Sequence, residues 1–144
     1  MKTLGAVLLL WAACVDASDV AIELNAEQIR AKVVEVTEAH NKMMLKGSTV
    51  ADVDALFALY SADFVYVHTV YGDTYSRDEL RGNSLRNVTA GRYKLTKDRY
   101  QIVQIIAGLN VAAVERLELD SGKKHLAVFE FRGAEVSKVT EYWK

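Results

Sequence analysis

The sequence contains no proline and a single cysteine, Cys14. One cysteine excludes an internal disulfide, a zinc site built on paired cysteines and a CxxC redox motif. A chain without proline has no polyproline linker and no ligand for proline-reading domains. An excess of one charge is also absent, because 18 Lys and Arg balance 19 Asp and Glu. This balance argues against the basic surface of a nucleic-acid-binding protein, so we expect no nucleic-acid partner.

Apolar residues are in excess at the start of the chain. Thirteen of the first 17 residues are apolar, and Lys2 is the one basic residue among them. The apolar run is shorter than the roughly 20 residues that span a membrane. A basic start, a short apolar run and small residues after it are typical of a secretory signal peptide. We predict that residues 1–17 are a signal peptide cut between Ala17 and Ser18, and that the protein is secreted or extracytoplasmic.

Two other interpretations of this segment stay open. One is an N-terminal anchor or a buried first helix, and the other is a bacterial lipoprotein signal that is cut before Cys14. Beyond the signal peptide we expect no membrane contact. The remaining residues, 18–144, have the length of one domain. They include the N-glycosylation sequon Asn87-Val88-Thr89, which matters where the host glycosylates secreted proteins.

Three helices are predicted, two of them from capping residues. Asn25 and Gln28 form a capping pair, and apolar residues then recur at steps of three and four, which predicts a helix over residues 25–46. A second apolar stripe predicts a helix over residues 51–60. Ser76 and Glu79 form a capping box that begins a third helix, which is expected to end at about Asn87.

The rest of the chain alternates with the period of strands. Phe64, Tyr66 and His68 share one face of a predicted strand over residues 64–69, which is rich in aromatic and β-branched residues. A turn follows at residues 71–73. Further strands are predicted over residues 92–106, with a bend or bulge, and over residues 111–119, 124–131 and 135–143. This order predicts an α+β domain in which helices cover one face of a curved antiparallel sheet.

Two segments resemble a known fold family. Residues 52–64, DVDALFALYSADF, resemble the second helix and the entry to the first strand of nuclear transport factor 2-like proteins. The ending, with FEFRG at 129–133, Val136 and EYW at 141–143, is similar to the last hairpin of SnoaL-like and ketosteroid-isomerase-like members. The resemblance spans residues 27–144 and implies a cone-shaped, cystatin-like α+β fold whose curved sheet and three N-terminal helices enclose a pocket. It does not specify an activity, because this fold hosts enzymes, ligand binders and association domains.

The isomerase mechanism is tested by the residues at its catalytic positions. His68 stands where the resemblance places the general base, an Asp. Ala127 stands where the isomerase has a protonated Asp as oxyanion donor, and the first helix carries no Tyr donor, although His40 falls nearby. Thr69 replaces the proline that follows the base. We therefore reject steroid isomerisation by that mechanism.

His68 and His40 are the candidate catalytic residues. His68 shares a strand face with aromatic residues that the resemblance turns toward the pocket, and His40 lies on the apolar face of the first helix. Two imidazoles across an apolar cavity are suited to act as base and electrophile. With a third ligand, Glu115, they would form a metal site. The competing interpretation is structural, with each histidine in the core and Glu115 paired with a basic residue at an edge.

The other candidates are ligand-binding residues. Aromatic walls with few polar groups are typical of small-molecule sites. Glu115 joins them because it shares a strand face with Val111 and Ala113, which predicts a buried carboxylate. The predicted ligand-binding residues are Phe64, Tyr66, Tyr71, Glu115, Phe129 and Trp143. The sequence has no glycine-rich phosphate loop, nucleophile elbow or paired-Asp metal motif, so we expect no cofactor and no metal.

Together these features predict a secreted SnoaL-like domain that binds a small apolar molecule in its pocket, with or without proton transfer by histidine. One alternative is a non-catalytic association domain. The resemblance implies a homodimer through the outer face of the sheet, where Val114, Arg116 and Glu118 are expected to lie. Another alternative is a hydrolase or dehydratase that depends on His68.

Overall fold

The computed structural model describes residues 23–144, so the predicted signal peptide lies outside the described residues. The described part contains three helices and six strands. In chain order they are α1 Ala26–Met44, α2 Val50–Phe57, β1 Tyr60–His68, β2 Asp73–Ser76, α3 Arg77–Thr89, β3 Tyr100–Gly108, β4 Val111–Glu118, β5 Lys123–Arg132 and β6 Glu135–Tyr142. None of the helices between residues 23 and 144 has the length and apolar character needed to cross a membrane.

Capping residues set where the helices begin. The side chain of Asn25 accepts a hydrogen bond from the backbone N–H of Gln28, and the side chain of Gln28 accepts one from the backbone N–H of Asn25, both at 2.9 Å. Ser76 and Glu79 form the same reciprocal box at the start of α3. Both predicted caps are therefore confirmed. A third box, Thr49 with Asp52, begins α2 and was not anticipated.

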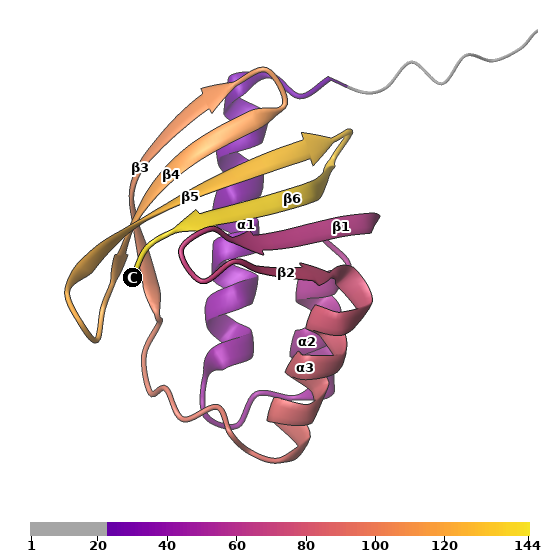
Figure 1. Cartoon of the computed structure of the whole chain (residues 1–144), viewed down its shortest axis with the longest axis vertical. Coiled ribbons are helices and arrows are strands. Elements are labelled where there is room, and N and C mark those ends of the chain that lie inside the picture. Colours follow the sequence, from indigo (N-terminus) through magenta and orange to yellow (C-terminus); the bar gives the residue numbers. More distant parts are fainter. Residues whose placement is uncertain (1–22) are drawn as a thin grey trace, which may run out of the picture.

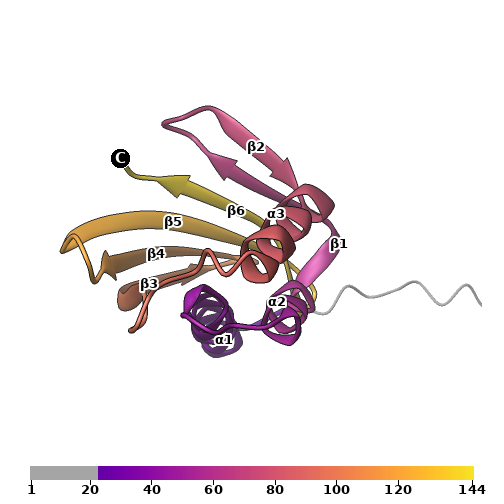
Figure 2. The ribbon, with the colours of Figure 1, turned by 90° about the horizontal axis from the view of Figure 1, so that it is seen from below.

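The six strands form one curved, unclosed sheet in the order β2-β1-β6-β5-β4-β3. All neighbouring strands are antiparallel except β1 and β6, which are parallel. The three helices lie against one face of the sheet (Figures 1 and 2). The predicted α+β cone is confirmed. Its one parallel pair brings the first strand of the chain beside the last, so residues of β1 and β6 meet one strand in from the β2 edge of the sheet.

Three stretches differ from the sequence-based expectation. The second helix, predicted over residues 51–60, ends at Phe57, and β1, predicted from Phe64, begins at Tyr60. The sequence predicts a turn at residues 71–73 and a helix cap at Ser76, but residues 73–76 pair with β1 as the short edge strand β2. The strand expected from residue 92 begins only at Tyr100. Before it, Leu95 pairs with Leu45 beyond the end of α1, and the backbone N–H of Lys46 donates to the carbonyl of Leu95 at 2.7 Å. The expected irregularity is present as a register shift between Ile102 and Gln104.

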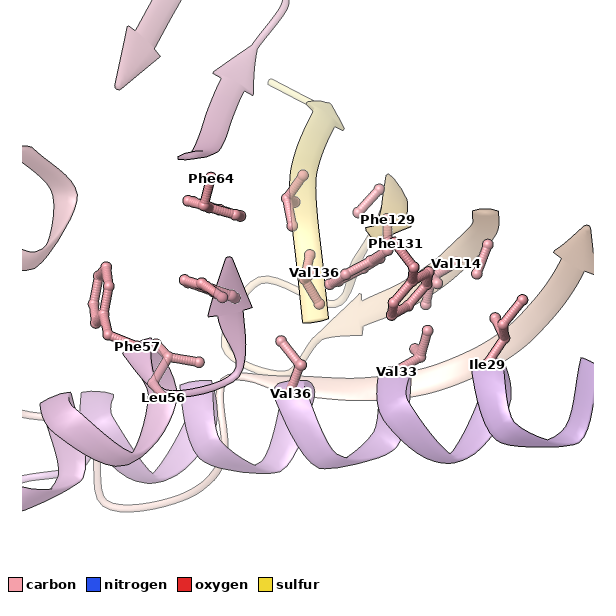
Figure 3. Close-up of a cluster of buried hydrophobic side chains, with 14 of the residues drawn as sticks. Ile29, Val33, Val36, Leu56, Phe57, Phe64, Val114, Phe129, Phe131 and Val136 are labelled. Atoms are coloured by element: carbon pink, nitrogen blue, oxygen red, sulfur yellow. The ribbon is translucent and has the colours of Figure 1, made fainter. Parts of the chain in front are cut away.

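The hydrophobic core fills the end of the cone that lies beside the first half of α1. Ile29, Val33 and Val36 of α1 are fully buried there, against inward-facing residues of the sheet such as Val114 and Val136 (Figure 3). The last turns of α1 carry different side chains, His40, Met43 and Met44. Met43 is still buried in the core cluster and Met44 packs against it, but all three side chains also border the cavity described next.

Candidate functional site

A cavity of about 330 Å³ lies between the three helices and the inner face of the sheet. A volume of this size is at the lower end of known small-molecule sites. Helix α1 contributes its last turns, α3 contributes Leu80, Asn83, Ser84 and Asn87, and the strands contribute four of the eight aromatic residues. The aromatic residues of the wall are Phe57, Tyr60, Tyr66, Tyr71, Tyr93, Tyr100, Phe129 and Trp143. The sequon residue Asn87 is thus part of the cavity wall.

Six of the eight predicted site residues line this one cavity. They are His40, Tyr66, His68, Tyr71, Phe129 and Trp143. They come from α1, β1, the turn after β1, β5 and the segment after β6. The tertiary fold therefore brings together residues that the sequence spreads over a hundred positions.

Phe64 and Glu115 lie elsewhere. Phe64 is buried in the core, with its ring stacked on that of Tyr60 at 4.0 Å between centres. It shares a face with Tyr66 and His68, as predicted, but sits at the packed end of the cone. Glu115 is partly exposed and forms an ion pair with Lys124 at 3.1 Å.

The predicted inner face of β4 was wrong. Ala112, Val114 and Arg116 are buried, whereas Glu115 lies on the opposite face, so the side expected to face outward faces the core and cavity. The alternation was ambiguous because both faces of this strand carry apolar residues together with charged ones. Arg116 can be buried because its charge has a partner on another strand.

That partner, Glu141, was missed by the sequence analysis. Nη2 of Arg116 donates to Oε1 of Glu141 at 2.5 Å, and the two side chains are 2% and 5% exposed. Oε2 of Glu141 accepts hydrogen bonds from the hydroxyl of Tyr66 at 2.8 Å and from Nε1 of Trp143 at 2.6 Å. A signal was present: the period-2 pattern of the last strand places Glu141 on the same face as Val139 and Trp143.

The network fixes the protonation states around it. Burial acts to raise the pKa of Glu141, but the charge of Arg116 and hydrogen bonds from Arg116 and Tyr66 outweigh it and lower that pKa to about 2. Burial and the Glu141 charge raise the pKa of Tyr66 far above its usual value and that of Tyr100 to about 12. At neutral pH the cavity therefore contains an ionised carboxylate and protonated phenols.

His40 is a neutral imidazole in this cavity. Its ring lies 5.9 Å from that of Tyr100 and is half-buried, because it borders the hollow rather than packed side chains. Burial and the nearby charge of Arg116 lower its pKa to about 4, although Glu141 acts in the opposite direction. A histidine with so low a pKa is a weak base, but it remains a good hydrogen-bond partner.

His68 is enclosed by aromatic rings. It is 4% exposed, and neither ring nitrogen has a hydrogen-bond partner among residues 23–144. The ring of Tyr71 stacks on it at 4.5 Å, and the ring of Trp143 meets it edge-on at 4.6 Å. Trp143 in turn stacks on His125 at 4.3 Å.

The two candidate catalytic histidines line the same cavity without touching. His40 contacts the ring of Tyr100, whereas His68 contacts Tyr71 and Trp143. Across the described residues, no group of three His, Cys, Asp or Glu side chains could hold a metal ion. The hypothetical third ligand, Glu115, is on the outer face of the sheet, so the described residues do not assemble the metal site that the sequence left open.

Comparisons with known proteins establish the fold. No protein-family model matches the chain, and no curated protein matches it. Among solved structures, an NTF-2 like protein of unknown function from Burkholderia xenovorans LB400 is 22% identical, with 81% of this chain and 82% of that chain covered and a TM-score of 0.58. A SnoaL-like protein of unknown function from Burkholderia thailandensis E264 is 14% identical, with 85% and 98% covered and a TM-score of 0.63.

A third similar structure contains a ligand. It is a hypothetical protein with a ketosteroid isomerase-like fold from Catenulispora acidiphila DSM 44928, in complex with trimethylamine. It is 17% identical, with 76% of this chain and 85% of that chain covered and a TM-score of 0.50. The chain thus has the nuclear transport factor 2-like fold, as its sequence motifs indicated.

The buried ion pair generates a prediction about stability. Replacing Glu141 with Gln leaves the charge of Arg116 buried without a counter-charge, which should reduce the free energy of unfolding by roughly 3 kcal/mol or more. The exposed pair Lys32–Glu35 offers a matched control, because Glu35→Gln should change it by less than about 0.5 kcal/mol. Urea unfolding measures both. Equal effects of the two substitutions would contradict the role given to Glu141.

The low pKa of His40 generates a prediction about pH. Above pH 6.5 this side chain is neutral in both the folded and the unfolded chain. Between pH 6.5 and about 4 the unfolded chain binds a proton that the folded protein does not, so the free energy of unfolding falls as the pH falls, by roughly 3 kcal/mol in total. The His40→Gln variant should lose this part of the pH dependence. An unchanged slope in urea unfolding at pH 4–7 would refute it.

Proposed function

We propose that this protein binds a small apolar molecule in the cavity of its cone. The observation that carries the proposal is the cavity itself, about 330 Å³ in volume, with eight aromatic residues in its wall. Aromatic walls with a few fixed polar groups are the usual composition of small-molecule sites. Met43, Met44 and Leu56 add flexible apolar surface to the same wall. Because residues 1–17 have the sequence pattern of a signal peptide, we further propose that binding takes place outside the cytoplasm.

The two histidines would have different roles in any chemistry on that molecule. His40 would stay neutral and donate or accept a hydrogen bond, since its pKa is lowered to about 4. A base would have to be His68, whose nitrogens are covered. Tyr71, which is 58% exposed and stacks on His68, is the ring that would need to move first. Proton transfer by His68 is therefore an additional proposal, and the binding of a small apolar molecule does not depend on it.

Filling the cavity tests the binding proposal. Leu80 of α3 lies in the cavity wall, so Leu80→Trp should occupy part of the volume and weaken binding at least tenfold. The ligand would be the tightest binder from a thermal-shift screen of apolar metabolites. Leu109→Trp is the matched control, because Leu109 is 71% exposed in the turn between β3 and β4. Titration calorimetry should show a loss for Leu80→Trp alone, and unchanged affinity in that variant would count against the cavity as the site.

We also propose that the protein forms a homodimer. Exposed apolar side chains on the outer face of the sheet favour this assembly. Ile106, Leu126 and Tyr142 are large, exposed side chains on three different strands. Leu126 and Tyr142 are direct neighbours across β5 and β6, and Ile106 and Leu126 border one shallow hollow. Contiguous exposed apolar surface of this kind is typical of an interaction site. We propose that a second copy of the chain covers it.

A charge placed in this surface tests the dimer. Leu126→Glu should convert a dimer to a monomer, because an unpaired carboxylate would be buried in the interface. Val34→Glu is the control, since Val34 is comparably exposed on α1, away from the sheet. Light scattering at several protein concentrations gives the mass. A wild-type chain that stays monomeric throughout would rule out the dimer.

A further inference from the structure

The charged groups of the cavity point to the class of its ligand, an inference that rests on the small-molecule binding proposed above. Two guanidinium groups lie against one ring: Cζ of Arg116 is 4.1 Å and Cζ of Arg99 is 5.0 Å from the centre of the Tyr100 ring. Arg99 also lies 5.8 Å from the centre of the Trp143 ring. These rings already interact with cations, so they are poorly placed to hold a cationic ligand as well.

The carboxylate in the cavity wall is occupied too. Both oxygens of Glu141 accept hydrogen bonds, one from Arg116 and the other from Tyr66 and Trp143. A ligand ammonium group would have to displace one of these buried donors to reach Glu141. The cost would be an unpaired polar group in a buried place. The aromatic wall therefore does not act as a cage for a cation.

Arg99, in contrast, has N–H groups that do not donate to any oxygen of the described residues. Its Nη1 donates to the sulfur of Met44 at 3.7 Å. Its Nε forms an ion pair with Oε1 of Glu118 at 3.6 Å, a distance too long for a hydrogen bond, so no N–H group of Arg99 is held by a carboxylate hydrogen bond. The other oxygen of Glu118 accepts from the backbone N–H of Ser121 at 2.9 Å. Nε of Arg116 is buried and has no acceptor within residues 23–144. Donors thus exceed acceptors on this side of the cavity.

The other polar groups of the wall are also consistent with an excess of hydrogen-bond donors over acceptors. Burial raises the pKa values of Tyr60 and Tyr100, so their hydroxyls stay protonated. His40 is kept neutral by burial and by the charges of Arg116 and Arg99, against the opposing effect of Glu141. A ligand that complements this wall brings acceptor oxygens, and preferably a negative charge.

We propose that the cavity takes a small carboxylic acid, bound as the carboxylate, with an apolar or aromatic body. The carboxylate binds the guanidinium of Arg99, whose side chain is 26% exposed and so can be reached from solvent. The body of the ligand packs among the rings of the wall. Arginine suits this role because its planar fork of N–H groups matches the two oxygens of a carboxylate.

The test uses four probes that share one phenylpropyl body, titrated into the full chain by calorimetry at pH 7. They are propylbenzene, 3-phenylpropanoate, 3-phenylpropanamide and 3-phenylpropylammonium. The carboxylate should bind at least tenfold more tightly than the amide and the ammonium, because charge-assisted hydrogen bonds are the stronger kind. Arg99→Gln should remove this preference, so that it weakens the binding of the carboxylate at least tenfold more than that of propylbenzene. Lys97→Gln, which removes an exposed charge paired with Asp120, should change nothing.

The possible results separate this inference from the proposed function. If propylbenzene binds but the amide or the ammonium equals the carboxylate, the carboxylate inference is overturned and apolar binding stands. If Arg99→Gln weakens all four probes equally, Arg99 only shapes the cavity, and the inference is again overturned. If none of the four binds, both proposals fail for ligands of this size.

A second variant guards against misfolding, because Arg99 packs on Tyr100 and Trp143. Arg99→Lys keeps the charge but not the fork, so it should retain a reduced preference for the carboxylate. Thermal unfolding of both variants checks that they fold. A lysine variant that folds and shows no preference at all would contradict an ionic contact at this position.

Discussion

The buried contact between Arg116 and Glu141 is the interaction on which the cavity depends. The two residues lie on β4 and β6, so their side chains meet across β5. Ala127 of β5 pairs directly with Glu141, and its methyl group leaves room for that contact. The ion pair thereby joins three strands on the inner face of the curved sheet. Neither charge could be buried there without the other, because an uncompensated charge in a low-dielectric site is costly.

This arrangement changes the chemistry that the fold resemblance implied. The ketosteroid isomerase uses a protonated Asp as a donor at the position of Ala127, whereas here the acid is on the neighbouring strand, as Glu141. Because Arg116 lowers the pKa of Glu141 to about 2, this acid is ionised and can only accept hydrogen bonds. It orients Tyr66 and Trp143 instead of stabilising an oxyanion. This sheet therefore carries a buried acid on its inner face that accepts hydrogen bonds and donates none.

The sequence was most informative where short-range rules apply. The capping pairs at Asn25 and Ser76 depend on neighbours three residues away, and both are present in the structure. Which face of β4 points inward is decided by the contact between Arg116 and Glu141. These residues are 25 positions apart, so no local sequence pattern reveals their contact. The alternation of apolar residues in β1 correctly places Phe64 and Tyr66 on one face of the strand. It does not show that Phe64 lies in the packed core of the cone whereas Tyr66 lies in the wall of the cavity. The edge strand β2 is only four residues long and is defined by its pairing with β1.

The same ion pair favours binding over proton transfer as the role of the cavity. Burial and the charge of Arg116 lower the pKa of His40 to about 4, and burial and the charge of Glu141 raise that of Tyr100 to about 12. Against the effect of burial, Arg116 lowers the pKa of Glu141 to about 2, so that all three values are far from neutrality. A general acid or base works best when its pKa is near the working pH, so these three groups are better suited to hold a ligand than to exchange protons with it. The rings of Tyr71 and Trp143 cover His68. Fixed donors and acceptors of this kind orient a ligand within an apolar cavity, which is the role we propose for the groups around the buried pair.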